Sequence, residues 1–159
     1  MSQRAEELSE LFTAFNDDLT AFVQNCSDEG WRKISPAEQW TVGVVAHHIA
    51  AGHYSAIETA KMIVAGEPLP NLTMDDLNQM NEQHAKENAG CTKDEVLSIL
   101  SQKGAAVNNF VAAICDGDLD RRAFHPILGA DVTTEQYVKM VMIDSSGDHL
   151  TNMKVTTGT

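Results

Sequence analysis

The stretch from Thr41 to Ile57 restricts the fold of this chain more than any other feature, because it contains no Asp, Glu, Lys or Arg. It reads TVGVVAHHIAAGHYSAI, and its three histidines make it too polar for a membrane-spanning helix. A helix that lacks a charged face must be buried on most of its circumference. The sequence therefore predicts a central helix that is surrounded by other helices.

Apolar residues recur at helical spacing in several further segments, and no segment alternates for long enough to predict a strand. Thr73 with Asp76, and Thr92 with Glu95, are typical of capping boxes at helix starts. Four long helices and one short extra helix, joined by long connections, predict an all-α four-helix bundle that forms a single domain over residues 1–159. The expected helices cover about residues 3–24, 41–65, 73–88, 92–114 and 133–154.

Composition and charge narrow the classes of function. Hydrophobic residues make up 43% of the chain, which is typical of a globular protein rather than a disordered or membrane protein. The net charge of −12 argues against nucleic acid and anionic membrane surfaces as partners. Cys26, Cys91 and Cys115 are widely spaced and odd in number, so we expect free thiols in a reducing compartment. The N-terminus has no apolar signal segment, and together these features predict a cytoplasmic protein.

The histidines are the candidate functional residues, and helical geometry separates them. His47 and His48 point about 100° apart, so only one of them can face a given site. His53 lies five positions after His48, about 140° around a straight α-helix, so those two are not expected to chelate one ion. We expect His47 and His53 at the helix flank or on a dimer surface, and His84 in an exposed polar segment.

Two segments carry a resemblance to a known family. WTVGVVAHHIA resembles the motif of the DinB-like superfamily, which includes DinB and mycothiol-dependent maleylpyruvate isomerase-type four-helix bundles. In that motif a histidine eight positions after the tryptophan is a metal ligand, and the corresponding pair here is Trp40 and His48. DSSGDHLTNM resembles the last-helix segment, where two histidines four residues apart supply the other ligands. His149 matches the second of these positions, but Ser145 stands at the first.

The resemblance implies a metal-dependent enzyme of the thiol-transferase or hydrolase type. It implies nickel, zinc or iron as the cofactor, because imidazoles suit such borderline metals. A low-molecular-weight thiol or another small molecule would be the substrate. With Ser145 in place of a histidine, the expected site has two imidazoles, His48 and His149, and a weak third position. No catalytic residue is assigned from the sequence.

The departure at Ser145 keeps a second interpretation open. In it the bundle holds no metal and is not catalytic, and it binds a small ligand or acts as a dimerisation module. His48 and His149 would then be hydrogen-bonded to each other, to Ser145 or to water inside the bundle. A homodimer is expected in either case, since symmetric dimers are the commonest oligomers.

Overall fold

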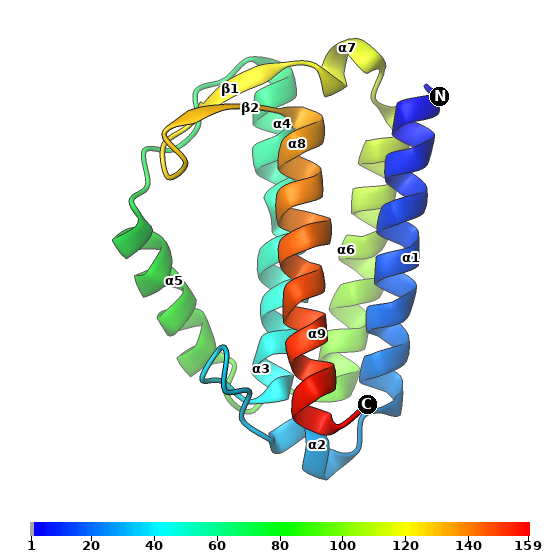
Figure 1. Cartoon of the computed structure of the whole chain (residues 1–159), viewed down its shortest axis with the longest axis vertical. Coiled ribbons are helices and arrows are strands. Elements are labelled where there is room, and N and C mark those ends of the chain that lie inside the picture. Colours follow the sequence, from blue (N-terminus) through cyan, green and yellow to red (C-terminus); the bar gives the residue numbers. More distant parts are fainter. Residues whose placement is uncertain (1) are drawn as a thin grey trace.

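The computed structural model describes residues 2–159, and its main body is the expected four-helix bundle (Figure 1). Two columns of the bundle are single helices, whereas each of the other two combines α-helical segments with a π-helical turn. The single helices are α1 (Gln3–Asn25) and α6 (Lys93–Ala113). The second column contains α3 (Val42–His47), a π-helical turn (His48–His53), a 3-10 turn (Tyr54–Ala56) and α4 (Ile57–Ala65). The last column contains α8 (Thr134–Val138), a π-helical turn (Lys139–Ser145) and α9 (Ser146–Thr157).

The capping boxes that the sequence predicts are present. The Thr92 hydroxyl accepts the Glu95 backbone N–H at 3.2 Å, and the Glu95 carboxylate accepts the Thr92 N–H at 3.1 Å. The same reciprocal pair joins Thr73 and Asp76 at the start of α5 (Met74–Glu87). These bonds satisfy N–H groups that have no partner within the helix, so the two helices begin where the sequence indicates.

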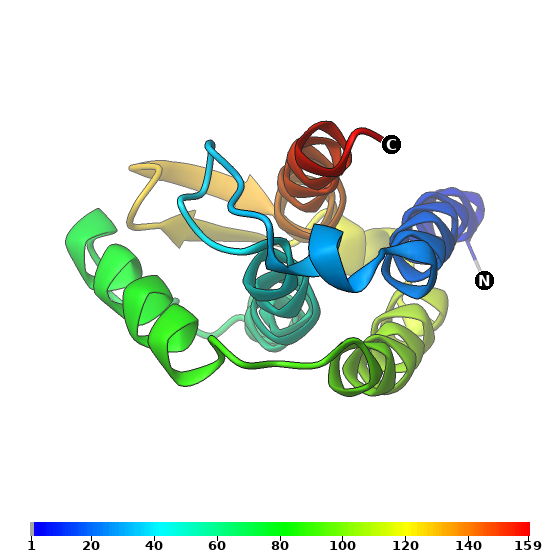
Figure 2. The same ribbon diagram turned by 90° about the horizontal axis from the view of Figure 1, so that it is seen from below.

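The charge-free helix is buried, as its composition requires. Every residue of α3 is buried, and the view along the bundle shows the second column between α9 and α6 with α1 beyond (Figure 2). At its start the Thr41 hydroxyl accepts the Val44 N–H at 3.2 Å. Further along, Tyr54 is fully buried and donates to the side-chain oxygen of Asn16 at 2.7 Å. The second column thus contributes core residues that pack against the neighbouring columns.

The π-helical turns interrupt the two columns that carry the histidines. A π-helical turn is rare and is found frequently at functional sites. Widening the helix leaves carbonyl groups that need partners, and the structure supplies them from side chains. The Ala51 carbonyl accepts bonds from the Ser55 hydroxyl and the Lys103 ammonium, and the Val141 carbonyl accepts one from Ser146.

The connections contain more structure than the sequence predicts. A short helix, α2 (Asp28–Arg32), lies in the first connection, and α7 (Asp116–Leu119) follows α6. The expectation of no strand is wrong for one segment, because β1 (Arg122–His125) pairs antiparallel with β2 (Ala130–Thr133). The turn between β1 and β2 contains Gly129 at a φ of 65°, a conformation that glycine adopts without strain. Strands of four residues are too short to give a clear alternating pattern in the sequence.

Helix α5 stands apart from the bundle on the outer side of α3 and α4 (Figures 1 and 2). None of its residues is buried, and two of its methionines, Met74 and Met80, are more than half exposed. Among the described residues, no helix combines the length and the apolar character that crossing a membrane requires.

We predict that Gly43→Ala destabilises the fold by about 1–3 kcal/mol, the usual cost of overpacking. A Cβ at Gly43 would lie 2.6 Å from two atoms of the Trp31 ring. The ring cannot easily move, because its N–H donates to the Cys91 carbonyl at 3.0 Å. Urea denaturation measures the free energy of unfolding. The matched control is Gly147→Ala in α9, where a Cβ has no neighbour within 4 Å, so this variant should gain about 0.5–1 kcal/mol. Equal effects of the two substitutions would contradict the packing argument.

Candidate metal centre

Three histidines from two columns of the bundle converge on one point. His48, His53 and His149 each offer one ring nitrogen, and these nitrogens lie within 4.8 Å of one another. The Nε2 atoms of His48 and His53 are 3.1 Å apart. The ring of His149 lies 5.3 Å from that of His48 and 5.1 Å from that of His53, centroid to centroid. We call these three residues the histidine triad.

The π-helical turn explains how His48 and His53 can face the same point. In a straight α-helix the two side chains would lie about 140° apart. In a π-helix the backbone bonds run from residue i to i+5 and each residue turns through a smaller angle, so a side chain five positions on lies much closer to the face of the first than in an α-helix. His48 and His53 are the first and last residues of such a turn. The expectation that they could not share a site, and that His53 lies on an outer flank, is therefore wrong.

The outer nitrogens of two triad members are held by hydrogen-bond acceptors. His53 Nδ1 lies 2.8 Å from the Val141 carbonyl, and His149 Nδ1 lies 2.8 Å from the Glu38 carboxylate. Because both partners can only accept, each Nδ1 must carry the proton. The Nε2 atom of each ring is then the nitrogen that is left for a ligand.

The donor set fits a divalent cation. Two nitrogens each about 2.1 Å from one ion and at right angles are about 3 Å apart, close to the separation of the His48 and His53 Nε2 atoms. Three imidazoles suit zinc, nickel or ferrous iron and leave coordination positions for water or substrate. Partners on the far nitrogens, such as a carbonyl and a carboxylate, are typical of metal-binding histidines.

Burial keeps the central member of the triad uncharged. His48 is 8% exposed, and its pKa is lowered to about 3, first by desolvation and then by the neighbouring His53 and His149. Burial also lowers the pKa of His53. A neutral imidazole is the form that binds a metal, so the environment selects the form that a metal site needs.

A second histidine pair adjoins the triad. His47 Nδ1 lies 2.8 Å from His84 Nε2, and the His84 ring is 5.8 Å from that of His48. The expectations of a flank or dimer-surface position for His47 and an exposed one for His84 are wrong, because His47 is buried and His84 is partly buried against it. The other nitrogen of His84 is buried and has no partner among the described residues. This pair connects α5 to the bundle.

Ser145 is not one of the three side chains that the structure brings together. It ends the second π-helical turn in helical conformation, four residues or about one turn before His149. Its role as a weak third ligand stays a prediction. Sequence reasoning missed Glu38, although a carboxylate two residues before Trp40 was a visible signal. It also missed His53, and the concentration of histidines in a charge-free helix was the signal there.

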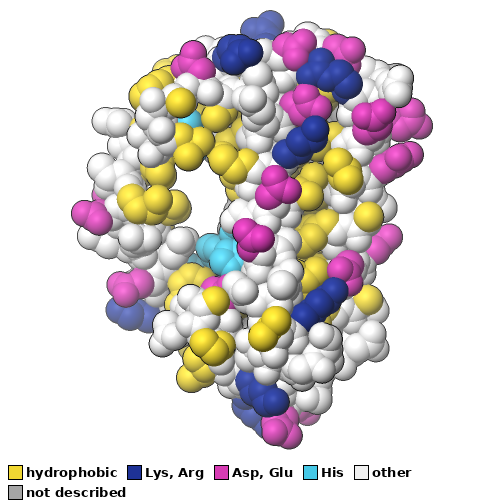
Figure 3. All heavy atoms as spheres, viewed as in Figure 1, with side chains coloured by type: hydrophobic (Ala, Val, Ile, Leu, Met, Phe, Trp, Pro, Cys, Tyr) yellow, Lys and Arg dark blue, Asp and Glu magenta, His cyan; other side chains and the backbone are white. Residues whose placement is uncertain are grey.

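The surface is open beside the histidines. The space-filling view shows an opening between α5 and the bundle, with histidine side chains at its lower edge (Figure 3). Helix α5, none of whose residues is buried, stands on one side of this opening. The His149 side chain is 22% exposed, so the triad is not sealed from solvent.

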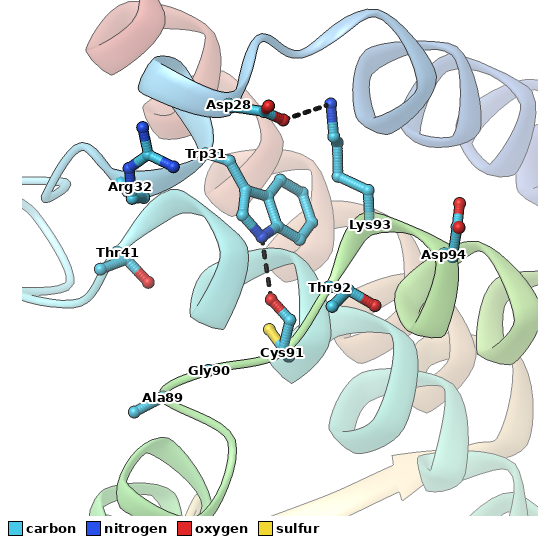
Figure 4. A pocket seen from close by; sticks show the side chains of 10 residues that line it. All are labelled: Asp28, Trp31, Arg32, Thr41, Ala89, Gly90, Cys91, Thr92, Lys93 and Asp94. Carbon is cyan, nitrogen blue, oxygen red and sulfur yellow. Dashed lines mark hydrogen bonds and ion pairs between the residues drawn. The ribbon is translucent and has the colours of Figure 1, made fainter.

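Another cavity, of about 440 Å³, lies away from the histidines, near the start of α6 (Figure 4). Within it Lys93 pairs with Asp28 at 3.3 Å, and the Trp31 ring points toward Cys91. Burial raises the pKa of the Cys91 thiol to about 11, so it is not a reactive thiolate at neutral pH. The lining contains no histidine, and we assign no chemistry to this cavity.

The bundle and the triad define a class of helical protein in which facing helices place ligands in the core. Residues 11–150 match the DinB superfamily, and the chain belongs to that family. Among solved structures it is similar to YfiT from Bacillus subtilis, with a TM-score of 0.75 and 15% sequence identity over 98% of this chain and 87% of that one. That protein is described as a probable metal-dependent hydrolase with an unusual four-helix bundle topology. No significant match is found among curated proteins.

We predict that the metal-free protein loses stability as the pH falls from 7 toward 4. The folded-state pKa of His48 is about 3, below the ordinary value of 6.5, so in this range the unfolded chain takes up a proton that the folded chain does not. The stabilisation is complete above the unfolded pKa and is lost progressively below it, by up to about 1.4 kcal/mol per pH unit for one such group. Urea denaturation after chelator treatment, at several pH values, measures the slope. His48→Gln should flatten it, and an unchanged slope would contradict this account.

Proposed function

We propose that the chain is a metal-dependent hydrolase of the DinB superfamily, with the histidine triad as its metal centre. The observation that carries the proposal is the convergence of His48, His53 and His149 with the outer nitrogens of two rings bound by acceptors. The description of YfiT as a probable metal-dependent hydrolase supports it. A divalent cation would supply Lewis-acid chemistry, which polarises water and the bond to be cleaved.

The residues of the chain have distinct tasks in this proposal. The triad holds the cation through its Nε2 atoms, and the Val141 carbonyl and the Glu38 carboxylate orient two of the rings. Burial keeps His48 neutral and lowers the local dielectric constant. His84 lies next to the triad and holds His47 through its Nε2 atom, so it supports the second column beside His48.

Elemental analysis of protein purified without an affinity tag or chelator tests the proposal. We expect about one zinc, nickel or iron per chain, and none in a His48→Ala control. The loaded protein should hydrolyse activated esters, amides or phosphate esters in a chelator-sensitive way. No metal, even after incubation with each ion, would overturn the proposal and favour the metal-free bundle. Transfer to a low-molecular-weight thiol, and a homodimer, stay predictions from the sequence, and gel filtration checks the second.

We predict that His53→Ala weakens zinc binding at least tenfold, whereas Ser145→Ala changes it little. Loss of a residue that only supports a ligand typically costs about 10–100-fold in affinity, so loss of a ligand should cost at least as much. Titration calorimetry on metal-free protein measures both dissociation constants.

Ser145→Ala is the matched control. Ser145 lies one turn from His149 and occupies the position that the family resemblance assigns to a metal ligand. If Ser145→Ala weakened binding and His53→Ala did not, the third ligand would be Ser145, and the assignment of His53 would be wrong.

A further inference from the structure

The Glu38 side chain is buried against the triad although it belongs to a loop. It is 6% exposed, and every one of its polar partners in the structure is a neutral donor or a histidine. Oε1 accepts from His149 Nδ1 at 2.8 Å and from Asn152 Nδ2 at 2.7 Å, while Oε2 accepts the Ser35 hydroxyl. These bonds lower the pKa of the Glu38 carboxyl against the opposing effect of burial. The structure thus maintains a carboxylate behind one imidazole of the proposed centre.

The loop around Glu38 is closed by backbone hydrogen bonds. Ser35 N–H donates to the Trp40 carbonyl and Gln39 N–H to the Ser35 carbonyl, each at 2.8 Å, and Ile34 forms a bridge with Thr41. Gln39 adopts a φ of 63°, which is uncommon for a residue other than glycine. Strained residues of this kind persist where the surrounding structure fixes them, often at functional sites. The loop is therefore a rigid support for the carboxylate.

The same loop contacts a second member of the triad. The Trp40 ring packs edge-on against the His48 ring at 5.2 Å between centroids. Glu38 and Trp40 thus contact His149 and His48 from one short segment between α2 and α3. A loop that only connected two helices would not need to place a buried carboxylate and an aromatic ring on two candidate ligands.

We propose that Glu38 is a positioning residue of the metal centre. Its carboxylate holds the proton of His149 on Nδ1 and fixes the plane of the ring, so that Nε2 faces the cation. The inference rests on the proposed function, since the ring is positioned for a ligand. It extends that function by assigning to a loop residue, outside both π-helical turns, control over the affinity of the site.

The tautomer of His149 in the metal-free protein tests this role directly. Long-range 15N–1H correlation spectra distinguish the Nδ1–H from the Nε2–H form. We expect the Nδ1–H form in the wild type and in Glu38→Gln, whose amide oxygen can still accept the bond. In Glu38→Ala we expect the Nε2–H form to appear. Asn152→Ala is the matched control, because it removes the other bond between Oε1 and α9 but leaves the bond to His149.

Zinc titration of the same four proteins provides the second readout. We expect Glu38→Ala to bind zinc about 10–100-fold more weakly than the wild type, and Asn152→Ala to bind it nearly as well. Glu38→Gln, which keeps the geometry and loses the charge, should fall between them.

An unchanged His149 tautomer in Glu38→Ala, or equal zinc affinities of Glu38→Ala and Asn152→Ala, would overturn the positioning role. A wild-type protein that binds no zinc, nickel or iron would instead overturn the proposed function. The tautomer measurement needs no metal, so it still decides whether Glu38 positions His149.

Discussion

The hydrogen bond between His53 Nδ1 and the Val141 carbonyl joins the two π-helical turns, and the candidate site depends on it. A carbonyl inside a regular α-helix is occupied by the backbone ladder of its own helix, whereas a widened turn leaves room for side-chain donors. Val141 accepts both His53 and the Ser146 hydroxyl. The irregular turn in the last column therefore orients an imidazole that the irregular turn in the second column brings to the site.

The cost of burying uncharged imidazoles in a bundle core is offset by hydrogen-bond partners. A buried polar group is unfavourable unless it is hydrogen-bonded, and the rings of His47, His53 and His149 each have a partner outside the triad. The net charge of −12 raises the local concentration of cations around the protein. The same acidic character that disfavours nucleic acid is compatible with a centre that recruits a metal ion.

The sequence predicts the regular parts of this fold well and the irregular parts poorly, for a physical reason. Capping boxes at Thr73 and Thr92 depend on local bonds, and local patterns identify them. A π-helical turn depends on side-chain donors from elsewhere in the chain, such as Lys103 to the Ala51 carbonyl. No local pattern reports such a contact. The error over His53 follows directly, because the angle between two side chains was calculated for a helix that the chain does not form.

In the proposed centre, His53 provides the imidazole that is missing at Ser145, which shows that a metal site has to preserve the positions of its ligand atoms. A metal ion responds to where nitrogen atoms lie, not to which helix carries them. The family resemblance places two ligands on the last helix. This chain has one histidine there, His149, and the other is His53, at the end of the π-helical turn in the second column. In the proposed centre His53 therefore replaces the imidazole that Ser145 lacks. This also accounts for three histidines in a charge-free helix, since His48 and His53 belong to the triad and His47 pairs with His84 on α5.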